Sequence, residues 1–316
     1  MNRVPIPEVG ADDALLRIHA CGICGSDVHR YLVDAYGSRF RYPLNSGHEF
    51  AGEVVTVGEH VTGFKPGEWV TGHPSWVEHG GAFAEYLLIL DADRNLISLG
   101  AATESEALDP ALISLIEPVT VGLNALKQCT PSSGPDARPH IVILGGGTIG
   151  LCVLLAAQAH GHTDIVVSEP SSLRRDIAES LGARTVESGG DDGLERLRAA
   201  VNADQGADIV IECAGSEDSI AQAVEIVARG GTLMMVALSR TAVGIPLMSV
   251  VTKGLKVLGM TGAPLDAYAS EAIEILGSRG SEILRLVTHR FPLADARDAF
   301  ELACDPDSCC KILIEP

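Results

Sequence analysis

The stretch IVILGGGTIGLCVLLAAQA, residues 141–159, decides the fold of this chain. Its first four residues are all apolar, which predicts a buried strand, and a helical pattern begins at Thr148. The turn between them has the spacing G-x-G-x-x-G. The first glycine allows a tight turn, the second lets a pyrophosphate approach the backbone, and the third lets helix and strand pack closely. Because a helix N-terminus also attracts an anion, the sequence predicts a dinucleotide site formed by Gly145, Gly147, Thr148, Ile149 and Gly150.

Strands and helices alternate after this turn. The apolar runs are DIVVSE, ADIVIECAG, GTLMMVAL and KVLGM, and helical segments that begin near Ser172 and Ser219 lie between them. Strands that are apolar on both faces and alternate with helices are typical of a parallel, doubly wound sheet. We therefore predict an α/β fold with a doubly wound parallel sheet over residues 120–262.

Glu169 ends the strand that follows the glycine-rich turn, nineteen positions after Gly150. An acidic residue at this distance fits the ribose hydroxyls of NAD, and its carboxylate repels the 2′-phosphate of NADP. Arg174 and Arg175 follow closely enough to keep NADP open as an alternative, since arginine accommodates that phosphate. The other interpretation of the two arginines is a solvated helix face. We expect NAD as the cofactor, with Glu169 and Arg174 beside it.

The first half of the chain has a different pattern. Residues 14–99 hold short alternating or apolar runs separated by glycine and proline, which predicts an irregular β-barrel. A helical pattern begins near Pro110. The last stretch, from Ala263, combines two helical segments with the strand KILIEP, which has no local partner and is expected to fold back onto the first domain. The predicted division is residues 1–119 with 263–316 as a catalytic domain, and residues 120–262 as a cofactor domain.

Three residues of the first half offer a thiolate, an imidazole and a carboxylate. Cys24 lies in the run CGICGSDVH, and His48 and Glu49 lie in LNSGHEF. This mixed set suits zinc, and fewer than four protein ligands leaves a place for a substrate. Adjacent side chains of a strand point to opposite faces, so His48 and Glu49 reach one metal only if the backbone bends after Gly47. The sequence predicts a catalytic metal site here, with Cys21 as a barrel residue.

Bulk properties exclude several classes of partner. The chain has 316 residues, of which 46% are hydrophobic and 21% charged, enough for two domains with cores. Its formal charge of −19 argues against nucleic acid and anionic membranes, which need a basic face. No run approaches the roughly 18 to 20 apolar residues of a membrane span, and the N-terminus lacks a signal-peptide layout, so we expect a cytoplasmic protein. The eight scattered cysteines argue against a disulfide framework, and Cys309 and Cys310 are expected to be packing residues.

Several motifs together make the chain similar to the zinc-dependent medium-chain dehydrogenase/reductase family, and to its sorbitol and threonine dehydrogenase branch more than to the liver alcohol dehydrogenases. They are ICGSDVH (Ile23–His29), GHEFAGEVVTVG (Gly47–Gly58), IEPVTVG (Ile116–Gly122), GGGTIG (Gly145–Gly150) and VTHRFPLADARDAFEL (Val287–Leu302). The resemblance covers nearly the whole chain. It implies a GroES-like barrel domain, a Rossmann domain, a catalytic zinc ion and NAD.

The resemblance makes Cys24 and His48 zinc ligands, while Glu49 and Glu117 compete for the remaining carboxylate place. We favour Glu49 as a ligand that can exchange with water. Glu117 is then the ligand or a water-bridged neighbour. The alternative for Glu117 is a helix-end carboxylate before Pro118.

The resemblance also implies roles in proton transfer. Ser26 and His29, in the ICGSDVH motif, match the family's proton relay: Ser26 takes the proton of the alcohol and hands it through the cofactor ribose, and His29 releases it. Asp27 resembles the carboxylate that orients the ligating His48. Thr120 would contact the nicotinamide, although a small residue there also serves packing.

Two departures from the family pattern lead to further expectations. Residues 71–80 form a short loop without cysteine, so the four-cysteine structural-zinc lobe is missing and one zinc ion per chain is predicted. His73, Glu78 and His79 in this loop could form a second metal site, but we expect them to be polar loop residues. The chain also starts almost at Val4, which indicates either a truncated start or a barrel without an outer strand. An uncovered edge would favour oligomer contacts or lower stability.

We therefore predict an NAD- and zinc-dependent alcohol dehydrogenase. It would transfer a hydride between NAD and a secondary alcohol, such as a polyol, cyclitol, sugar or amino-alcohol, or reduce the ketone, in a cleft between the domains that excludes water when it closes. One alternative is a zinc-free quinone or alkene reductase of the same superfamily, which has no reason to keep Cys24, His48 and Glu49. The other is a cofactor-binding protein without turnover.

Two further expectations concern the partners. Tyr31, Trp76 and Phe83 are candidates for lining the substrate pocket, and their spacing does not rank them. A homodimer or homotetramer is expected, because the resemblance implies that GTLMMVAL and the apolar segment after it could extend a sheet across a dimer.

Overall fold

The structure of the chain, a computed structural model, describes residues 3–32, 46–74, 80–99, 109–129, 139–201, 205–239 and 241–316. The chain divides into two compact units. Unit 1 consists of Met1–Glu117, Pro264–Asp305 and Lys311–Pro316, and unit 2 consists of Pro118–Ala263 and Pro306–Cys310. The sequence-based division places the segment 306–310 with the first domain, whereas in the structure it packs with unit 2.

Unit 2 is built on a six-stranded parallel sheet with the order β11-β10-β9-β6-β7-β8. Its strands are β6 (Ile141–Leu144), β7 (Ile165–Ser168), β8 (Arg184–Val186), β9 (Ala207–Glu212), β10 (Val227–Met235) and β11 (Lys256–Gly259). In chain order this is the 3-2-1-4-5-6 arrangement of dinucleotide-binding folds, whose ligands sit at the carboxyl ends of the strands where the order reverses. That point lies between β6 and β9.

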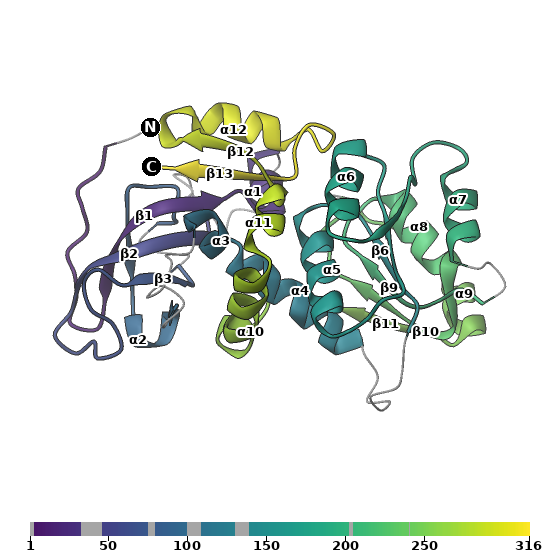
Figure 1. Cartoon of the computed structure of the whole chain (residues 1–316), viewed down its shortest axis with the longest axis horizontal. Coiled ribbons are helices and arrows are strands. Elements are labelled where there is room, and N and C mark those ends of the chain that lie inside the picture. The colour runs from purple at the N-terminus through teal and green to yellow at the C-terminus, as the bar shows by residue number, and fades with distance from the viewer. Residues whose placement is uncertain are drawn as a thin grey trace. The chain divides into compact units, whose positions relative to one another are not determined.

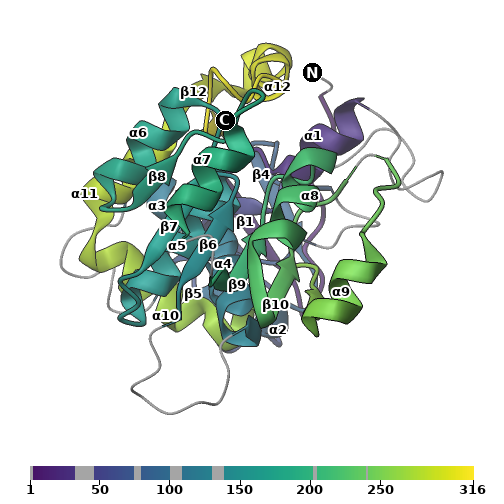
Figure 2. The ribbon, with the colours of Figure 1, turned by 90° about the vertical axis from the view of Figure 1, so that its right-hand side faces the viewer.

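Helices cover both faces of this sheet. They are α4 (Ile116–Cys129), α5 (Thr148–Ala159), α6 (Ser172–Ser180), α7 (Gly193–Ala200), α8 (Glu217–Ile226) and α9 (Leu247–Lys253). In Figure 1, α5 and α6 lie on one side of β6 and β9, and α7 and α8 lie on the other; Figure 2 shows the same layers from a second side. All residues of β6 and β7 are buried because both faces are covered.

Unit 1 contains a seven-stranded sheet in the order β12-β13-β1-β2-β3-β5, with β4 paired to β1 off this path. The strands are β1 (Ala14–Gly22), β2 (Glu49–Val57), β3 (Trp69–Gly72), β4 (Tyr86–Ile89), β5 (Leu96–Ser98), β12 (Val287–Pro292) and β13 (Lys311–Glu315). Strand β13 pairs antiparallel with β1, so the prediction that the C-terminal strand returns to the first domain is confirmed. β1 joins the barrel core to the last residues of the chain.

Except for α10, which has 14 residues, the helices of unit 1 have eight residues or fewer. They are α1 (Gly25–Leu32), α2 (Ala92–Asn95), α3 (Pro110–Ser114), α10 (Leu265–Ser278), α11 (Gly280–Ile283) and α12 (Ala296–Ala303), with 3-10 turns at Leu284–Leu286 and Leu293–Asp295. The helical pattern predicted from Pro110 is two helices, because Leu115 separates α3 from α4. Helix α12 runs along β12 and β13 (Figure 1).

The sequence did not predict several short elements, among them β8, α7, α9 and β12. β8 has three residues, none of them buried, so no apolar run marks it. Helix α9 contains no buried residue, so a buried apolar face does not mark it in the sequence. β12 (VTHRFP) likewise contains no buried residue. Among the described residues, no helix is both long and apolar enough to cross a bilayer.

A matched pair of glycine substitutions tests the packing of unit 2. A Cβ on Gly122 in α4 would lie 2.5 Å from the carbonyl carbon of Cys152 in α5, whereas nothing lies within 4 Å of a Cβ on Gly277 in α10. We expect Gly122→Ala to destabilise the protein by about 1–3 kcal/mol, because backbone atoms cannot move aside. Gly277→Ala should stabilise it by about 0.5–1 kcal/mol through helix propensity. Urea unfolding followed by circular dichroism measures both, and equal midpoints for the two variants would contradict the close helix contact.

Candidate functional site

Three side chains of unit 1 place a sulfur, a nitrogen and an oxygen in one small cluster. The ligand atoms of Cys24, His48 and Glu49 all lie within 4.8 Å of one another, and within the described residues this is the only group of three or more metal-ligand side chains so arranged. Cys24 precedes α1, His48 precedes β2 and Glu49 is the first residue of β2. His48 and Glu49 are buried and Cys24 is partly buried.

Gly47 lets two adjacent side chains reach the same cluster. It has a φ of +98°, a left-handed conformation that favours glycine. A Cβ at this position would lie 2.8 Å from Sγ of Cys21 and 3.0 Å from the backbone nitrogen of Phe83. The chain therefore turns sharply before His48, as the sequence requires if His48 and Glu49 are to share one ion. Cys21 belongs to the barrel core, and burial raises the pKa of its thiol well above the usual range.

Asp27 connects the two stretches that carry the cluster. Its Oδ2 accepts a hydrogen bond of 3.0 Å from the backbone N–H of Cys24, and its Oδ1 accepts one from the hydroxyl of Ser46. The first contact holds the backbone at the start of α1, as the third residue of a capping box does. The distance from Oδ2 to Nδ1 of His48 is 4.0 Å, too long for a hydrogen bond. Asp27 therefore acts on His48 through its charge and holds the loops of Cys24 and Ser46 directly.

Lys311 neutralises the buried carboxylate of the cluster, and the sequence reading missed it. Its Nζ lies 2.5 Å from Oε2 of Glu49 and donates a 3.0 Å hydrogen bond to the carbonyl of Ile23. Lys311 is 2% exposed and Glu49 is 1% exposed. A buried carboxylate is costly unless it is paired. Gly22, which faces Glu49 across β1 and β2, leaves the space, since a Cβ there would lie 2.2 Å from Oε2 of Glu49.

The cluster has strongly shifted protonation equilibria in the absence of metal. Burial lowers the pKa of His48, but the hydrogen bond and charge of Cys24, with the charges of Glu117 and Asp27, raise it to about 10. Burial raises the pKa of Glu117 to about 7 against the opposing charge of His48. Burial and the charge of His48 lower the pKa of His73. The protein without metal therefore keeps a proton on His48 at neutral pH.

The remaining predicted residues of this site lie on α1 and α4. Glu117 is outside the three-residue cluster, but it is near enough for its charge to raise the pKa of His48. Ser26 and His29 are both partly buried on α1, three residues apart, so they share one side of that helix. Thr120 is buried in α4.

Aromatic rings gather near the turn that precedes His48. Phe83 contacts Gly47, its ring centroid lies 5.5 Å from that of Phe300 in an edge-to-face arrangement, and Phe300 lies 5.3 Å from Tyr31. Phe300 comes from α12, far along the chain, and sequence spacing could not associate it with Tyr31. Of the other predicted loop residues, Trp76, Glu78 and His79 lie outside the described residues.

The glycine-rich turn of unit 2 has the features that a dinucleotide requires. Gly145 has a φ of +99°, and a Cβ on Gly150 would lie 1.9 Å from the carbonyl oxygen of Gly145. Gly147 caps α5 without a side-chain hydrogen bond, so side chains leave the helix N-terminus uncapped. Only Arg174 comes within 4 Å of a Cβ placed on Gly147. Thr148 and Ile149 open the helix and are partly buried. The turn therefore offers an open anion-binding cradle.

Glu169 is fixed beside this turn by backbone amides. Its Oε2 accepts a 2.6 Å hydrogen bond from the N–H of Gly146, and its Oε1 accepts a 2.8 Å bond from the N–H of Ser171. Arg174 donates from Nε to the carbonyl of Cys309 at 2.9 Å. Arg175 donates from Nη1 to the carbonyls of Glu169 and Pro170. Both guanidinium groups therefore hold backbone oxygens, and both residues are partly buried.

A second buried carboxylate lies at the carboxyl end of a strand beside β6 in the same sheet, and it was not predicted from the sequence. Glu212 ends β9 and is fully buried; its Oε1 accepts hydrogen bonds from the N–H groups of Ala214 and Gly215 and from the hydroxyl of Ser219. A Cβ on Gly145 would lie 3.0 Å from the nitrogen of Ala214. Glu212 thereby fixes the backbone at Ala214, against which the glycine-rich turn packs.

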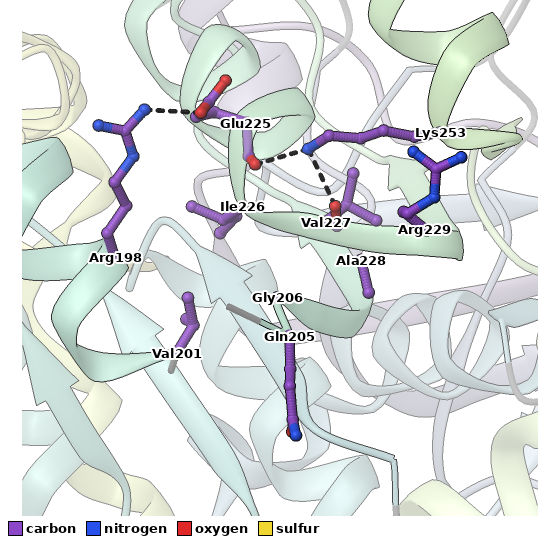
Figure 3. A pocket seen from close by; sticks show the side chains of 10 residues that line it. All are labelled: Arg198, Val201, Gln205, Gly206, Glu225, Ile226, Val227, Ala228, Arg229 and Lys253. Atoms are coloured by element: carbon purple, nitrogen blue, oxygen red, sulfur yellow. Dashed lines mark hydrogen bonds and ion pairs between the residues drawn. The ribbon is translucent and has the colours of Figure 1, made fainter. Parts of the chain in front are cut away.

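A pocket of about 170 Å³ lies elsewhere in unit 2, at the end of α8 and the start of β10 (Figure 3). Lys253 donates to the carbonyls of Val224, Glu225 and Val227, and Arg198 pairs with Glu225. These cations are already satisfied within the protein. We therefore assign the pocket a structural role in holding α9 to α8.

The residues present fit a zinc ion and a dinucleotide. A thiolate, an imidazole and a carboxylate that converge within 4.8 Å are a donor set for zinc with room for a further ligand. The cradle at Gly147, with Glu169 fixed beside it, fits a pyrophosphate and a ribose.

Comparisons with known proteins agree with this geometry. The family model of the alcohol dehydrogenase GroES-like domain matches residues 10–100, and that of the zinc-binding dehydrogenase matches residues 148–277. L-threonine 3-dehydrogenase of Bacillus licheniformis is 32% identical, with 99% of this chain and 94% of that protein covered. Sorbitol dehydrogenase of Mus musculus is 31% identical, with 97% and 93% covered.

Solved structures share the fold. 2R,3R-butanediol dehydrogenase from Bacillus subtilis superposes with a TM-score of 0.83 at 27% identity, covering 100% of this chain and 95% of that chain. A protein from Sinorhizobium meliloti described as a zinc-binding dehydrogenase, with bound NADP, gives 0.82 at 30% identity, covering 99% and 94%. The predicted fold class is confirmed. Neither the zinc-free reductase nor the binding protein without turnover receives support.

We expect zinc binding to release protons. Because the pKa of His48 is about 10 without metal, and a ligating imidazole must be neutral, zinc displaces a proton at pH 7. The apparent zinc affinity should therefore rise with pH between about 6 and 9. Isothermal titration calorimetry in buffers of different ionisation enthalpy counts the released protons. A binding heat that is independent of the buffer would contradict the prediction.

We expect Lys311→Met to destabilise the protein without metal by about 3–5 kcal/mol, because it leaves the buried carboxylate of Glu49 without a counter-charge. The double variant Glu49→Gln/Lys311→Met should lose less, since it buries no charge. Excess zinc should stabilise Lys311→Met more than the wild type, because a bound cation again offsets Glu49. Thermal unfolding with and without zinc measures these differences, and a metal-free Lys311→Met variant as stable as the wild type would show that the pair contributes little.

Proposed function

The chain belongs to the zinc-binding alcohol dehydrogenase family and is a zinc-dependent oxidoreductase acting on alcohols, and on this premise we propose that it oxidises a secondary alcohol with NAD, or reduces the ketone. The observation that carries the proposal is the convergence of Cys24, His48 and Glu49 within 4.8 Å. One zinc ion per chain is proposed, since within the described residues no second cluster of metal-ligand side chains occurs.

The side chains around the cluster are proposed to have different roles in the reaction. Zinc, held by Cys24 and His48 with Glu49 or Glu117, would supply a Lewis acid for the alcohol oxygen, and the nicotinamide would accept the hydride. Ser26 accepts the proton of the alcohol. His29, three residues farther on the same side of α1, releases it to water. Thr120 is proposed to contact the nicotinamide.

Glu49 is proposed as the exchangeable ligand of the site. Among the hydrogen bonds of the described residues, its carboxylate is held by the side chain of Lys311 and by no backbone amide. If Glu49 were to leave a bound ion, Lys311 would keep its carboxylate neutralised, which would lower the cost of a free buried carboxylate.

NAD is proposed over NADP on the placement of Glu169. Two backbone amides hold its carboxylate at the end of β7, where it can accept ribose hydroxyls and would repel a 2′-phosphate. Arg175, one of the two residues that could accommodate that phosphate, already holds backbone carbonyls through Nη1, and Nε of Arg174 holds the carbonyl of Cys309. The structurally similar protein from Sinorhizobium meliloti binds NADP, so the preference of this chain between NAD and NADP is to be measured directly.

The substrate is proposed to be a polyol, sugar, cyclitol or amino-alcohol. The relatives named above are dehydrogenases of threonine, sorbitol and 2,3-butanediol, in each of which a secondary alcohol has a polar neighbour. Tyr31 and Phe83, with Phe300, are proposed to line its pocket, because their rings contact one another beside Gly47.

A homo-oligomer is proposed from an apolar face of unit 2. Leu247, Met248 and Val251 on α9 are 71%, 74% and 69% exposed. Strand β11, which follows α9, is at the edge of the six-stranded sheet. An edge strand beside apolar side chains is a surface on which a second copy can add its own sheet. A cytoplasmic location is proposed because all eight cysteines are free.

The proposal is tested by metal analysis and an NAD-coupled screen over polyols and amino-alcohols. We expect about one zinc ion per chain, turnover of at least one of these alcohols, and a lower kcat/KM with NADP. Cys24→Ser should lose zinc and reduce kcat/KM by about a hundredfold or more, as for removal of a group that acts in the transition state. Cys304→Ser, a partly buried cysteine outside the cluster, is the control. Full activity in protein stripped of metal would refute the proposal.

A further inference from the structure

The segment Pro306–Cys310 joins two elements of unit 1 but packs with unit 2. It connects α12 to β13, and Cys309 within it is 2% exposed. Because the residues on both sides of it belong to unit 1, the chain passes into unit 2 and back within a few residues. Pro306, Asp307 and Ser308 are exposed, so the segment is held to unit 2 through the buried Cys309 and the partly buried Cys310.

Arg174 holds this segment beside the glycine-rich turn. Its Nε donates a 2.9 Å hydrogen bond to the carbonyl of Cys309, and its Nη1 lies 3.6 Å from the position of a Cβ on Gly147. Thr148, the first residue of α5, makes a longer contact of 3.5 Å from its hydroxyl to the carbonyl of Cys310. A guanidinium group presents its donors as a rigid planar fork, so Nε can hold Cys309 while Nη1 faces an anion in the cradle.

The next residue along the chain is the cation of the metal cluster. Lys311 directly follows Cys310, and its Nζ holds Glu49 and the carbonyl of Ile23. The carbonyl of Cys310 therefore belongs to the peptide bond that leads directly to Lys311, the residue that neutralises Glu49. A restraint on the backbone of Cys309 and Cys310 therefore also restrains the backbone position of Lys311.

We propose that Arg174 is a positioning residue through which the dinucleotide and the zinc ion bind cooperatively. The proposal rests on the proposed function, in which the cradle takes the pyrophosphate and Glu49 is a ligand. An anion at Gly147 fixes the guanidinium group of Arg174, which fixes the carbonyl of Cys309 and, through the segment, the Lys311–Glu49 pair. The order already imposed by one ligand makes the second bind more tightly, and by linkage the effect is reciprocal.

Arg175 provides a matched control for this proposal. It is the next residue of α6 and also holds backbone carbonyls, but those of Glu169 and Pro170, which precede the same helix. It has no contact with segment 306–310 among the hydrogen bonds of the described residues. Removing Arg175 takes away the same charge near the cofactor and leaves the bond from Arg174 to Cys309 intact.

The experiment measures zinc affinity by competition with a chromophoric chelator, without NADH and with saturating NADH. In the wild type we expect NADH to tighten zinc binding about fivefold or more, within the usual range of coupling between sites. In Arg174→Met and Arg174→Lys the factor should fall to about one, while Arg175→Met keeps it. Arg174→Lys retains a cation for the phosphate but lacks the planar fork, so it separates cofactor binding from coupling.

Two results would overturn the proposal: a wild-type factor of about one, or an Arg174→Lys variant that keeps the wild-type factor once NADH is saturating. The reciprocal titration, NADH affinity with and without zinc, must give the same factor in each variant. A wild-type protein that binds neither zinc nor NADH would instead refute the proposed function. Binding of both ligands without coupling refutes only the role of Arg174.

Discussion

Unit 1 depends on burying a carboxylate that must stay charged. Glu49 is almost fully removed from solvent, and such a group destabilises a protein unless an opposite charge or several donors accompany it. Lys311 meets that requirement from the last strand of the chain, and Gly22 leaves the space for it. The antiparallel pairing of β13 with β1 is therefore both a packing contact and the means of neutralising the cluster.

This constraint explains why unit 1 is discontinuous in sequence. The candidate ligands Cys24, His48 and Glu49 come from the first fifty residues, but the counter-charge arrives only at Lys311. A fragment that ended after Glu117 would bury Glu49 without its partner. Most of unit 2 therefore lies within the sequence of unit 1, and the chain changes unit after Glu117, Ala263, Asp305 and Cys310.

Local signals made much of the architecture predictable, and long-range pairings made the rest inaccessible. The glycine-rich turn and Glu169 were predictable because each belongs to a short stretch with fixed geometry, and the Cys24–His48–Glu49 set because its residue types together suit one metal ion. Lys311 was not, since a lysine after two cysteines at the start of a strand normally indicates a solvated edge. Glu212 was hidden in an apolar run, where only its bonds to the turn after β9 show its role. The edge elements β8 and α9 bury little, so hydrophobic periodicity could not predict them.

The carboxylates of the two sites are held in different ways, and the difference follows from what each must do. Backbone amides of Gly146 and Ser171 hold Glu169, and because the fold fixes those amides, the carboxylate stays where a ribose would need it. Glu49 has a side-chain partner, Lys311, whose Nζ also donates to the carbonyl of Ile23. A group that recognises a cofactor gains from rigid donors, since movement would lower its selectivity. A ligand that is to leave and rejoin an ion needs a counter-charge in both positions, and Lys311 supplies that charge from β13.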